Sequence, residues 1–396
     1  MPKPLLIVGL SAAAFIGTAH AEPAAGDGWE FKIGGRLQLD YASVDTDRSG
    51  GEWSANELRR LRLGVSGKFG DNLKYKVELN TNSSNEVNLE DGYLEFAPGG
   101  TDWKVKVGQF KTPNSLDEQT SSRFISTLER AAFTDAFEFN RRVGVSVATE
   151  GETYTFTAGV FGDNVEADDA QEGHAVAARL TYTPVKPSDT ADLLVHIGGS
   201  ARYREIGDTQ SDLRYRQRPV SHIPGRIIST GRIAQSDMFY GFEAAALYQN
   251  VWLAGEYGVT DADCAACASD PSLSGAYVEA GMMFGGRKTY KGGKFNRPIV
   301  DHPVTENGMG ALALVARIDT IDLDNAGVDG GSYDAYVIGA DWWATKYTRL
   351  GLNLFSVEAD LGTSTSGLDS RFAGLVTGNV TNEDATGAVL RAQFDF

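Results

Sequence analysis

Cysteine, proline and long apolar runs are all scarce in this sequence. Only 2 of its 396 residues are Cys and 12 are Pro, which excludes a disulfide scaffold and a collagen-like chain. After residue 21, no apolar run approaches the roughly 20 residues of a membrane-spanning helix. The hydrophobic share of 42% excludes a disordered chain. The length would fit two or three soluble domains, but the 46 Gly also suit the turns of one large all-β unit.

Basic residues are in the minority, with 36 Lys and Arg against 53 Asp and Glu and a formal net charge of −17 at pH 7. A chain with this average charge repels nucleic acid phosphates, so we expect no nucleic acid partner. The net charge does not say how the basic residues are distributed, and it is compatible with a local basic surface.

Motifs of catalysis and metal binding are also missing. The five His are scattered, and neither His-Glu-x-x-His nor Gly-x-Ser-x-Gly occurs. His196 with Ser200 is the one local pair that a hydrolase could use. Cys264 and Cys267 predict a small local disulfide rather than a redox centre, and a single such pair is weak support for zinc. We therefore predict that the protein is not an enzyme and that it carries no cofactor or metal.

The first 21 residues have the pattern of a secretory signal. Lys3 precedes an apolar run from Leu5 to Ile16, and Ala19-His20-Ala21 forms a small-x-small cleavage site before Glu22. The run is too short for a transmembrane anchor. We expect residues 1–21 to be removed and residues 22–396 to form the exported protein.

Alternation of apolar and polar residues runs through nearly all of the exported part. In one segment, Leu61, Leu63 and Val65 alternate with Arg60 and Arg62. Each segment is close to the roughly 10 residues of a tilted membrane-spanning strand, and an even number near sixteen is typical of bacterial outer-membrane barrels. The expected strands are 29–43, 57–69, 73–82, 86–97, 102–110, 139–149, 153–162, 174–184, 191–205, 236–249, 250–260, 274–285, 309–322, 332–344, 346–358 and 385–396.

The connections and the C-terminus favour the same fold class. Short turns such as 70–72 alternate with long loops, which matches short periplasmic turns and long external loops. The last alternating strand ends in Phe396, which resembles the assembly signal of outer-membrane barrels. A soluble sandwich could also end on such a strand, but the strand count and the signal segment favour the barrel. The third loop, 111–138, mixes apolar and charged residues and is expected to fold inward, whereas 286–308 is a long basic segment where a short turn is expected.

Strand parity places many cations on the lumen face of this barrel. An Arg on the lipid face costs about 2–4 kcal/mol at the bilayer midplane, so the apolar residues must face lipid. The expected pore-lining residues are Arg62, Lys76, Arg202 and Arg204 on strands, and Arg214, Arg216, Arg218 and Arg226 in the following loop. In one interpretation these charges pair with nearby acids, as in nonselective pores. In the other they attract anions, since rings of Arg and Lys select anions and phosphate.

Several of these segments resemble the phosphate-selective porin O/P family. The runs that carry the resemblance are 107–111, 115–117, 120–122 and 128–130, with Leu58-Arg59-Arg60, residues 75–79 and the basic connection 286–298. The resemblance implies a sixteen-stranded barrel, usually trimeric, in which the third loop narrows the pore. It implies substrate-binding residues Arg59, Arg60, Lys74 and Asp91 on the wall and Ser121, Ser122 and Arg130 on the loop.

Two features set this chain apart from that pattern. Phosphate-specific members carry a lysine three residues before the paired serines, where this chain has Glu118. An anion in place of a cation should weaken phosphate binding. Arg59 and Arg60 also have opposite strand parity, so both can face inward only if the strand contains a bulge.

The sequence therefore predicts a passive, multi-pass channel of the bacterial outer membrane that favours anions, with phosphate or a related oxyanion as its leading solute. Small anions, outer-membrane lipid and further copies of the chain in a homotrimer are the expected partners. A nonselective or organic-anion pore on the same barrel is the nearest alternative. A hydrolase using His196 and Ser200 is a remote one, and an adhesin barrel would not need the row of cations.

Overall fold

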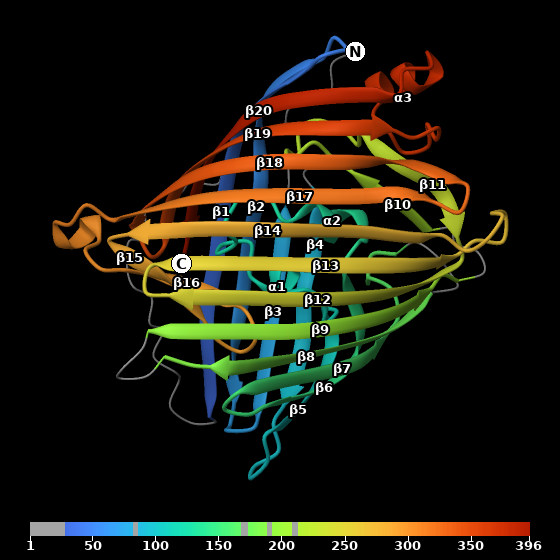
Figure 1. Ribbon diagram of the computed structural model, residues 1–396. Coiled ribbons are helices and arrows are strands. Elements are labelled where there is room, and N and C mark those ends of the chain that lie inside the picture. Colours follow the sequence, from blue (N-terminus) through green and yellow to red (C-terminus); the bar gives the residue numbers. More distant parts are fainter. Residues whose placement is uncertain (1–27, 82–85, 168–172, 188–191, 208–212) are drawn as a thin grey trace, which may run out of the picture.

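Sixteen strands close into one antiparallel barrel (Figure 1). The computed structural model describes residues 28–81, 86–167, 173–187, 192–207 and 213–396, so the expected signal segment lies outside the described residues. The strands are β1 (Trp29–Thr46), β2 (Glu52–Phe69), β3 (Leu73–Thr81), β4 (Val87–Phe96), β5 (Trp103–Lys111), β6 (Arg141–Glu150), β7 (Tyr154–Phe161), β8 (His174–Val185), β9 (Leu193–Glu205), β12 (Ser236–Tyr248), β13 (Val251–Asp263), β14 (Ser272–Phe284), β17 (Ala311–Asn325), β18 (Val328–Thr345), β19 (Thr348–Leu361) and β20 (Asn382–Asp395). Pairing of β20 with β1 closes the ring, and the predicted fold class is confirmed.

Apolar side chains cover the outside of the barrel, and charged side chains lie inside. Leu63 of β2 and Ile338 of β18 are 58% and 60% exposed, whereas Arg62 and Arg349 are 8% and 1% exposed. This distribution is the reverse of that in a soluble protein. It follows from the bilayer, which accepts apolar side chains and disfavours charges. The alternation of Leu61, Leu63 and Val65 with Arg60 and Arg62 is confirmed, because the apolar residues are exposed and the two arginines are buried.

The two ends of the barrel carry different connections. At the end that we call the loop end, β10 (Leu213–Gln217) pairs with β11 (Ile228–Ala234), and α3 (Ser370–Thr377) lies between β19 and β20. At the opposite, turn end, β15 (Gly286–Tyr290) and β16 (Phe295–Val300) form a hairpin that is followed by η1 (Val304–Glu306). In Figure 1 the loop end lies to the right and the turn end to the left. The alternation of residues in the sequence predicted none of these small elements.

Two further details concern the disulfide and the helices. Cys264 and Cys267 form a disulfide in the β13–β14 connection, as the local spacing predicted. Among the residues described, no helix is both long enough and apolar enough to cross a membrane.

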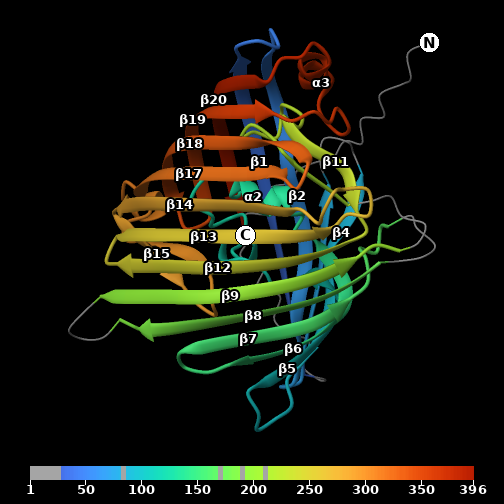
Figure 2. The same cartoon turned by 45° about the vertical axis from the view of Figure 1, so that its right-hand side comes forward.

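The third loop, which we define as residues 112–140, contains the short helices α1 (Leu116–Gln119) and α2 (Ala132–Ala136). Its backbone amides donate to Glu256 of β13 and Asp319 of β17, and its carbonyls accept from Arg391 of β20. Figures 1 and 2 both show α2 within the ring of strands. These contacts with the polar faces of well-separated strands place the loop against the inner wall.

A β-bulge resolves the opposite parity of Arg59 and Arg60. Gln38 of β1 pairs with Arg60, but the next residue, Leu39, pairs with Leu58, so Arg59 is the extra residue on β2. Both guanidinium groups can then point into the barrel. The strand therefore contains the bulge that the sequence requires if Arg59 and Arg60 are both to face inward.

We predict that charge on the outer surface destabilises the barrel according to its depth. Ile338→Arg, near the middle of β18, should lower the free energy of unfolding in lipid vesicles by about 2–4 kcal/mol, whereas Val87→Arg, at the first residue of β4, should lower it by about 0–1 kcal/mol. Urea titration of vesicle-folded protein measures both values. Equal costs at the two positions would contradict the placement of the apolar belt.

Candidate functional site

Two cavities meet at the third loop. A loop-end cavity of about 240 Å³ lies between the third loop and the segment after β10, and a central cavity of about 330 Å³ lies on the other side. Arg60, Glu118 and Arg130 line both. We call these three residues the junction. It brings one wall residue from β2 together with two residues of the loop.

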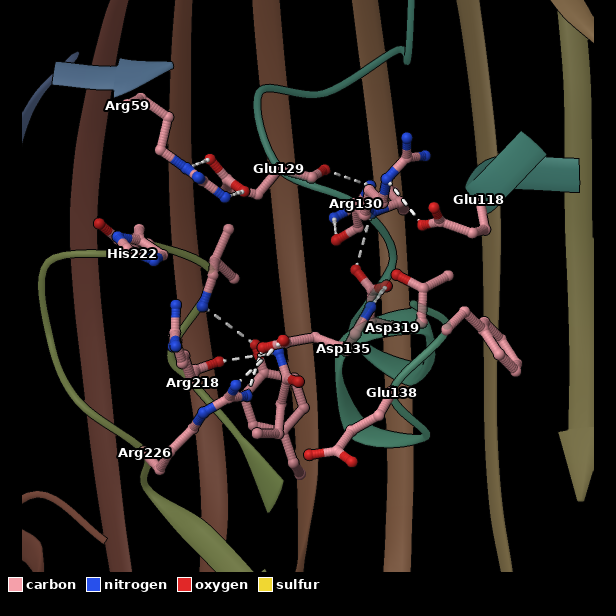
Figure 3. Close-up of a pocket in the computed structure, with 18 of the residues that line it drawn as sticks. Arg59, Glu118, Glu129, Arg130, Asp135, Glu138, Arg218, His222, Arg226 and Asp319 are labelled. Atoms are coloured by element: carbon pink, nitrogen blue, oxygen red, sulfur yellow. Dashed lines mark hydrogen bonds and ion pairs between the residues drawn. The ribbon is translucent and has the colours of Figure 1, made fainter. Parts of the chain in front are cut away.

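Opposite charges nearly balance in the loop-end cavity (Figure 3). Arg59 forms a two-bond ion pair with Glu129, with distances of 2.8 Å from Nε and 2.9 Å from Nη2. Arg226 pairs with Asp135 of α2. The cations that line this cavity are Arg59, Arg60, Arg130, Arg218, Arg226 and Arg317, and the carboxylates are Glu118, Glu129, Asp135, Glu138 and Asp319.

Cations dominate the central cavity. In the described part of the chain, ten Lys and Arg side chains line it against three carboxylates, and the hydroxyl groups of Ser121 and Ser122 are present as well. The cations are Arg36, Arg60, Arg62, Lys76, Lys106, Lys111, Arg123, Arg130, Arg141 and Lys294, and the carboxylates are Glu78, Asp91 and Glu118. Such an excess of one sign attracts solutes of the opposite sign.

Some of these cations are paired and others are not. Asp91 lies 2.5 Å from Lys76 and 2.7 Å from Arg141. Arg60 donates to the Gln38 amide oxygen at 3.0 Å, and within the described part of the chain neither Arg60 nor Lys294 forms an ion pair. Arg60 and Lys294 are therefore the cations of this cavity most available to a solute anion.

The structure brings most of the predicted substrate-binding residues together. Arg60, Asp91, Ser121, Ser122 and Arg130 line the central cavity, along with the predicted pore-lining residues Arg62 and Lys76. Of the two main cavities, Arg59 lines only the one at the loop end. Lys74 lies apart from the group, in a separate cavity toward the turn end, where it pairs with Glu95 at 3.5 Å.

Arg202 and Arg204 do not have the predicted pore-lining environment. They are 1% and 2% exposed, and Arg204 pairs with Asp237 at 2.5 Å. Arg202 donates to the carbonyl oxygens of Phe137 and Glu138 just after α2. The strand parity correctly predicted that these side chains point inward. The third loop covers them, however, and they hold the loop in place rather than line the pore.

The four arginines of the β9–β12 connection separate into two pairs. Arg218 and Arg226 line the loop-end cavity. Arg214 and Arg216 alternate with buried residues on β10 and are partly exposed. Burial and the neighbouring charges of Arg226 and Arg214 lower the pKa of Arg216 to about 10. This lowered pKa reflects a cluster of cations with few acids near it.

The third loop is anchored by wall residues that no sequence motif had indicated. The buried carboxylate of Glu256 accepts hydrogen bonds from the Ser115 hydroxyl at 3.1 Å and from the backbone amides of Leu116 and Asp117 at 2.9 and 2.7 Å. Arg349 donates to the carbonyl oxygens of Ile125 and Ser126. Inward parity of these wall residues was visible in the sequence, but their partners on the loop were not.

The β15–β16 hairpin reaches the same loop from the turn end. Lys288 donates to the Ser126 hydroxyl at 2.5 Å, and its ammonium group lies 4.8 Å from the ring centre of Trp252 and 4.4 Å from that of Phe295. Lys294, in the turn between β15 and β16, lines the central cavity. The basic segment that broke the pattern of short turns therefore contributes to the interior of the barrel.

The pair proposed for a hydrolase is not assembled as a catalytic pair. His196 is fully buried, its Nδ1 lies 2.7 Å from the Tyr290 hydroxyl, and its Nε2 lies 3.1 Å from a Glu243 oxygen. Both ring nitrogens are therefore engaged by groups other than Ser200. The residues described contain no group of three or more His, Cys, Asp or Glu placed to hold a metal ion.

Sequence comparison relates the chain to porins. The sequence model of the family described as phosphate-selective porin O and P matches residues 31–396. An uncharacterised protein of Caulobacter vibrioides is 34% identical over 340 residues, covering 82% of this chain and 67% of that protein. Porin O of Pseudomonas aeruginosa is 24% identical over 419 residues, covering 93% of this chain and 89% of that protein.

Solved structures share the fold at low sequence identity. An anion-selective porin from Comamonas acidovorans matches with a TM-score of 0.59 and 14% identity, covering 93% of this chain and all of that one. The trimer form of OmpT of Vibrio cholerae matches with a TM-score of 0.56 and 12% identity, again covering 93% of this chain and 100% of the other. At these identities the likeness concerns the fold.

We predict that Glu256 fixes the start of the third loop. Glu256→Ala removes the acceptor of two backbone amides, so amide hydrogen exchange at residues 116–118 should become about tenfold faster or more. Glu383→Ala is the matched control, because Glu383 accepts from the backbone amides of Arg48 and Ser49 in another loop. This role would be contradicted if exchange at residues 116–118 became faster in the control, or if it did not become faster in Glu256→Ala.

Proposed function

This chain belongs to the family of phosphate-selective porins O and P, and from that premise we propose that its outer-membrane channel favours anions. Phosphate or a related small oxyanion is the leading solute. Passage is passive, since diffusion down a gradient requires only attraction and a path. Arg60, Ser121, Ser122 and Arg130 are the proposed contacts of the solute in the central cavity.

The observation that carries the proposal is the excess of cations in the central cavity, where Arg60 and Lys294 pair with no carboxylate among the described residues. Among the described residues, ten cations and three carboxylates line it, although the whole chain carries a net charge of −17. Concave, low-dielectric walls with one sign of charge raise the local concentration of oppositely charged solutes. Guanidinium, ammonium and hydroxyl groups are all donors, and an oxyanion accepts several hydrogen bonds at once.

The type of cation changes along the interior. The loop-end cavity is lined by arginines. Toward the turn end, a further cavity of about 180 Å³ adjoins the central one, and its cations are Lys104, Lys106, Lys111 and Lys294, with one arginine, Arg179, that pairs with Glu243. Arginine binds oxyanions with two parallel hydrogen bonds, whereas lysine offers a strongly hydrated point charge. An anion therefore meets directional donors first and hydrated ammonium groups later.

A nonselective or organic-anion pore is the second candidate. Ion pairs such as Arg59 with Glu129 and Lys76 with Asp91 neutralise part of the cationic lining. Fully paired walls would leave little preference between ions. Arg60 and Lys294, which form no ion pair with any described residue, favour the anion channel over this alternative.

We further propose that the protein works as a homotrimer in outer-membrane lipid. The support is the family resemblance, which implies a trimer, and the fold shared with the trimer form of OmpT of Vibrio cholerae. Each barrel would then carry its own pore, because both cavities are lined by residues of one chain.

The proposal predicts an anion-biased reversal potential in planar bilayers under a KCl gradient. Arg60→Gln should lower the chloride-to-potassium permeability ratio several-fold, because it removes a cation that has no carboxylate partner among the described residues. Lys346→Gln removes an exposed cation from the β18–β19 turn and should leave the ratio unchanged. A cation-biased potential in the unmodified protein would refute the proposal.

The same measurement should depend on pH through Lys294. Burial, together with the charges of Lys106, Arg179 and Lys76, lowers the pKa of Lys294 to about 8. Raising the pH from 7 to 9 removes its proton, so anion selectivity should fall through that range. Lys294→Arg keeps its charge at pH 9 and should weaken the dependence. Lys294→Met should show the lower selectivity already at pH 7, and identical pH profiles in all three proteins would contradict this role.

A further inference from the structure

One carboxylate occupies the junction between the two main cavities. Of the five carboxylates that line the loop-end cavity and the three that line the central cavity, only Glu118 is common to both. It belongs to α1 of the third loop and is 7% exposed. An anion that crosses between the cavities at the junction therefore comes close to this group.

Glu118 bridges two cations at this position. Its Oε1 lies 2.7 Å from Lys111 Nζ, and its Oε2 lies 3.0 Å from Arg130 Nε. The two carboxylate oxygens thus contact the cations in the way that two oxygens of a bound oxyanion would. Burial raises the pKa of Glu118, but the charges of Arg130 and Lys111 outweigh it and lower the pKa below its ordinary value. The group is therefore ionised at neutral pH.

The surrounding contacts hold this arrangement in place. The backbone amide of Glu118 donates to the Ser115 hydroxyl at 3.1 Å, and Glu256 accepts from Ser115 and from the two amides that precede Glu118. Arg130 is held as well, since its Nη2 donates to the Thr120 carbonyl at 2.8 Å and its Nη1 to the Asp117 carbonyl. Glu118 and Arg130 are therefore both held in position by hydrogen bonds within the loop.

An incoming oxyanion must therefore share Arg130 and Lys111 with a fixed negative charge. Like charges at a distance of a few ångströms repel, and the repulsion grows with the charge of the solute. Arg60, which pairs with no carboxylate in the described residues, is the junction cation left for the solute.

We propose that Glu118 is a resident carboxylate that occupies the oxyanion position at the junction, so that the pore lets small oxyanions such as phosphate pass without retaining them, and passes monovalent anions in preference to divalent ones. The proposal rests on the proposed anion-favouring channel and names its solute class. Glu118 is then the residue that determines specificity within an otherwise cationic path.

The test is block of chloride current by added sulfate or inorganic phosphate in planar bilayers. The unmodified protein should show chloride current with little block at millimolar sulfate. Glu118→Gln keeps the size of the side chain and removes its charge, so it should lower the half-blocking concentration by about tenfold or more. Glu118→Asp keeps the charge, so sulfate should block its current as weakly as it blocks the current of the unmodified protein. Glu306→Gln neutralises an exposed carboxylate at the turn end and is the matched control.

The outcomes separate this proposal from the one on which it rests. Strong block of the unmodified protein, or equal block in the unmodified and Glu118→Gln proteins, overturns the role of Glu118 while an anion-biased reversal potential still supports the channel. A cation-biased reversal potential refutes the anion channel itself. Should Glu118→Gln fail to form channels, Glu118→Ser replaces it, with the same expected direction of change.

Discussion

The fold depends on one constraint: a charged side chain on a spanning strand cannot face lipid, so it must face the interior and find a partner there. Arg349, Arg391 and Glu256 are all buried on the inner wall. A wall made only of strands offers them few backbone groups, because the strand amides and carbonyls already pair with neighbouring strands. The third loop supplies those groups. Its carbonyls accept from wall arginines and its amides donate to wall carboxylates, so the charges that the bilayer forces inward also position the loop.

This constraint divides the basic residues into two groups with different tasks. Arg202, Arg204 and Arg349 are almost fully buried, and they bind wall carboxylates and loop carbonyls. They stabilise the interior and are closed to solutes. Arg60 and Lys294 face the central cavity without a carboxylate partner among the described residues. Counting inward cations therefore overstates the charge that a solute meets, and only the pairing pattern separates structural cations from those that can attract an anion.

The junction shows how small local changes build a selective site. A single extra residue in β2 lets Arg59 and Arg60 both turn inward, where Arg59 binds Glu129 and Arg60 stays available. One anchored turn of α1 then places Glu118 between Lys111 and Arg130. The same cationic path can retain an oxyanion or let it pass, depending on whether this one position carries an opposing charge. The hairpin at the turn end adds Lys294 to the path.

The sequence by itself determined the barrel, its strand number and the inward face of nearly every strand, because the two-residue period and the exclusion of charge from lipid act within each strand. It also revealed that Arg59 and Arg60 require a bulge. Only the tertiary structure decided which inward cations are covered, as Arg202 and Arg204 are, and that Lys74 lies apart from the other candidate residues. The small strands β10, β11, β15 and β16 and the anchor at Glu256 were likewise hidden. These features depend on partners from distant strands, and those partners depend on how the ring closes and where the third loop lies. The periodicity within one segment therefore does not predict them.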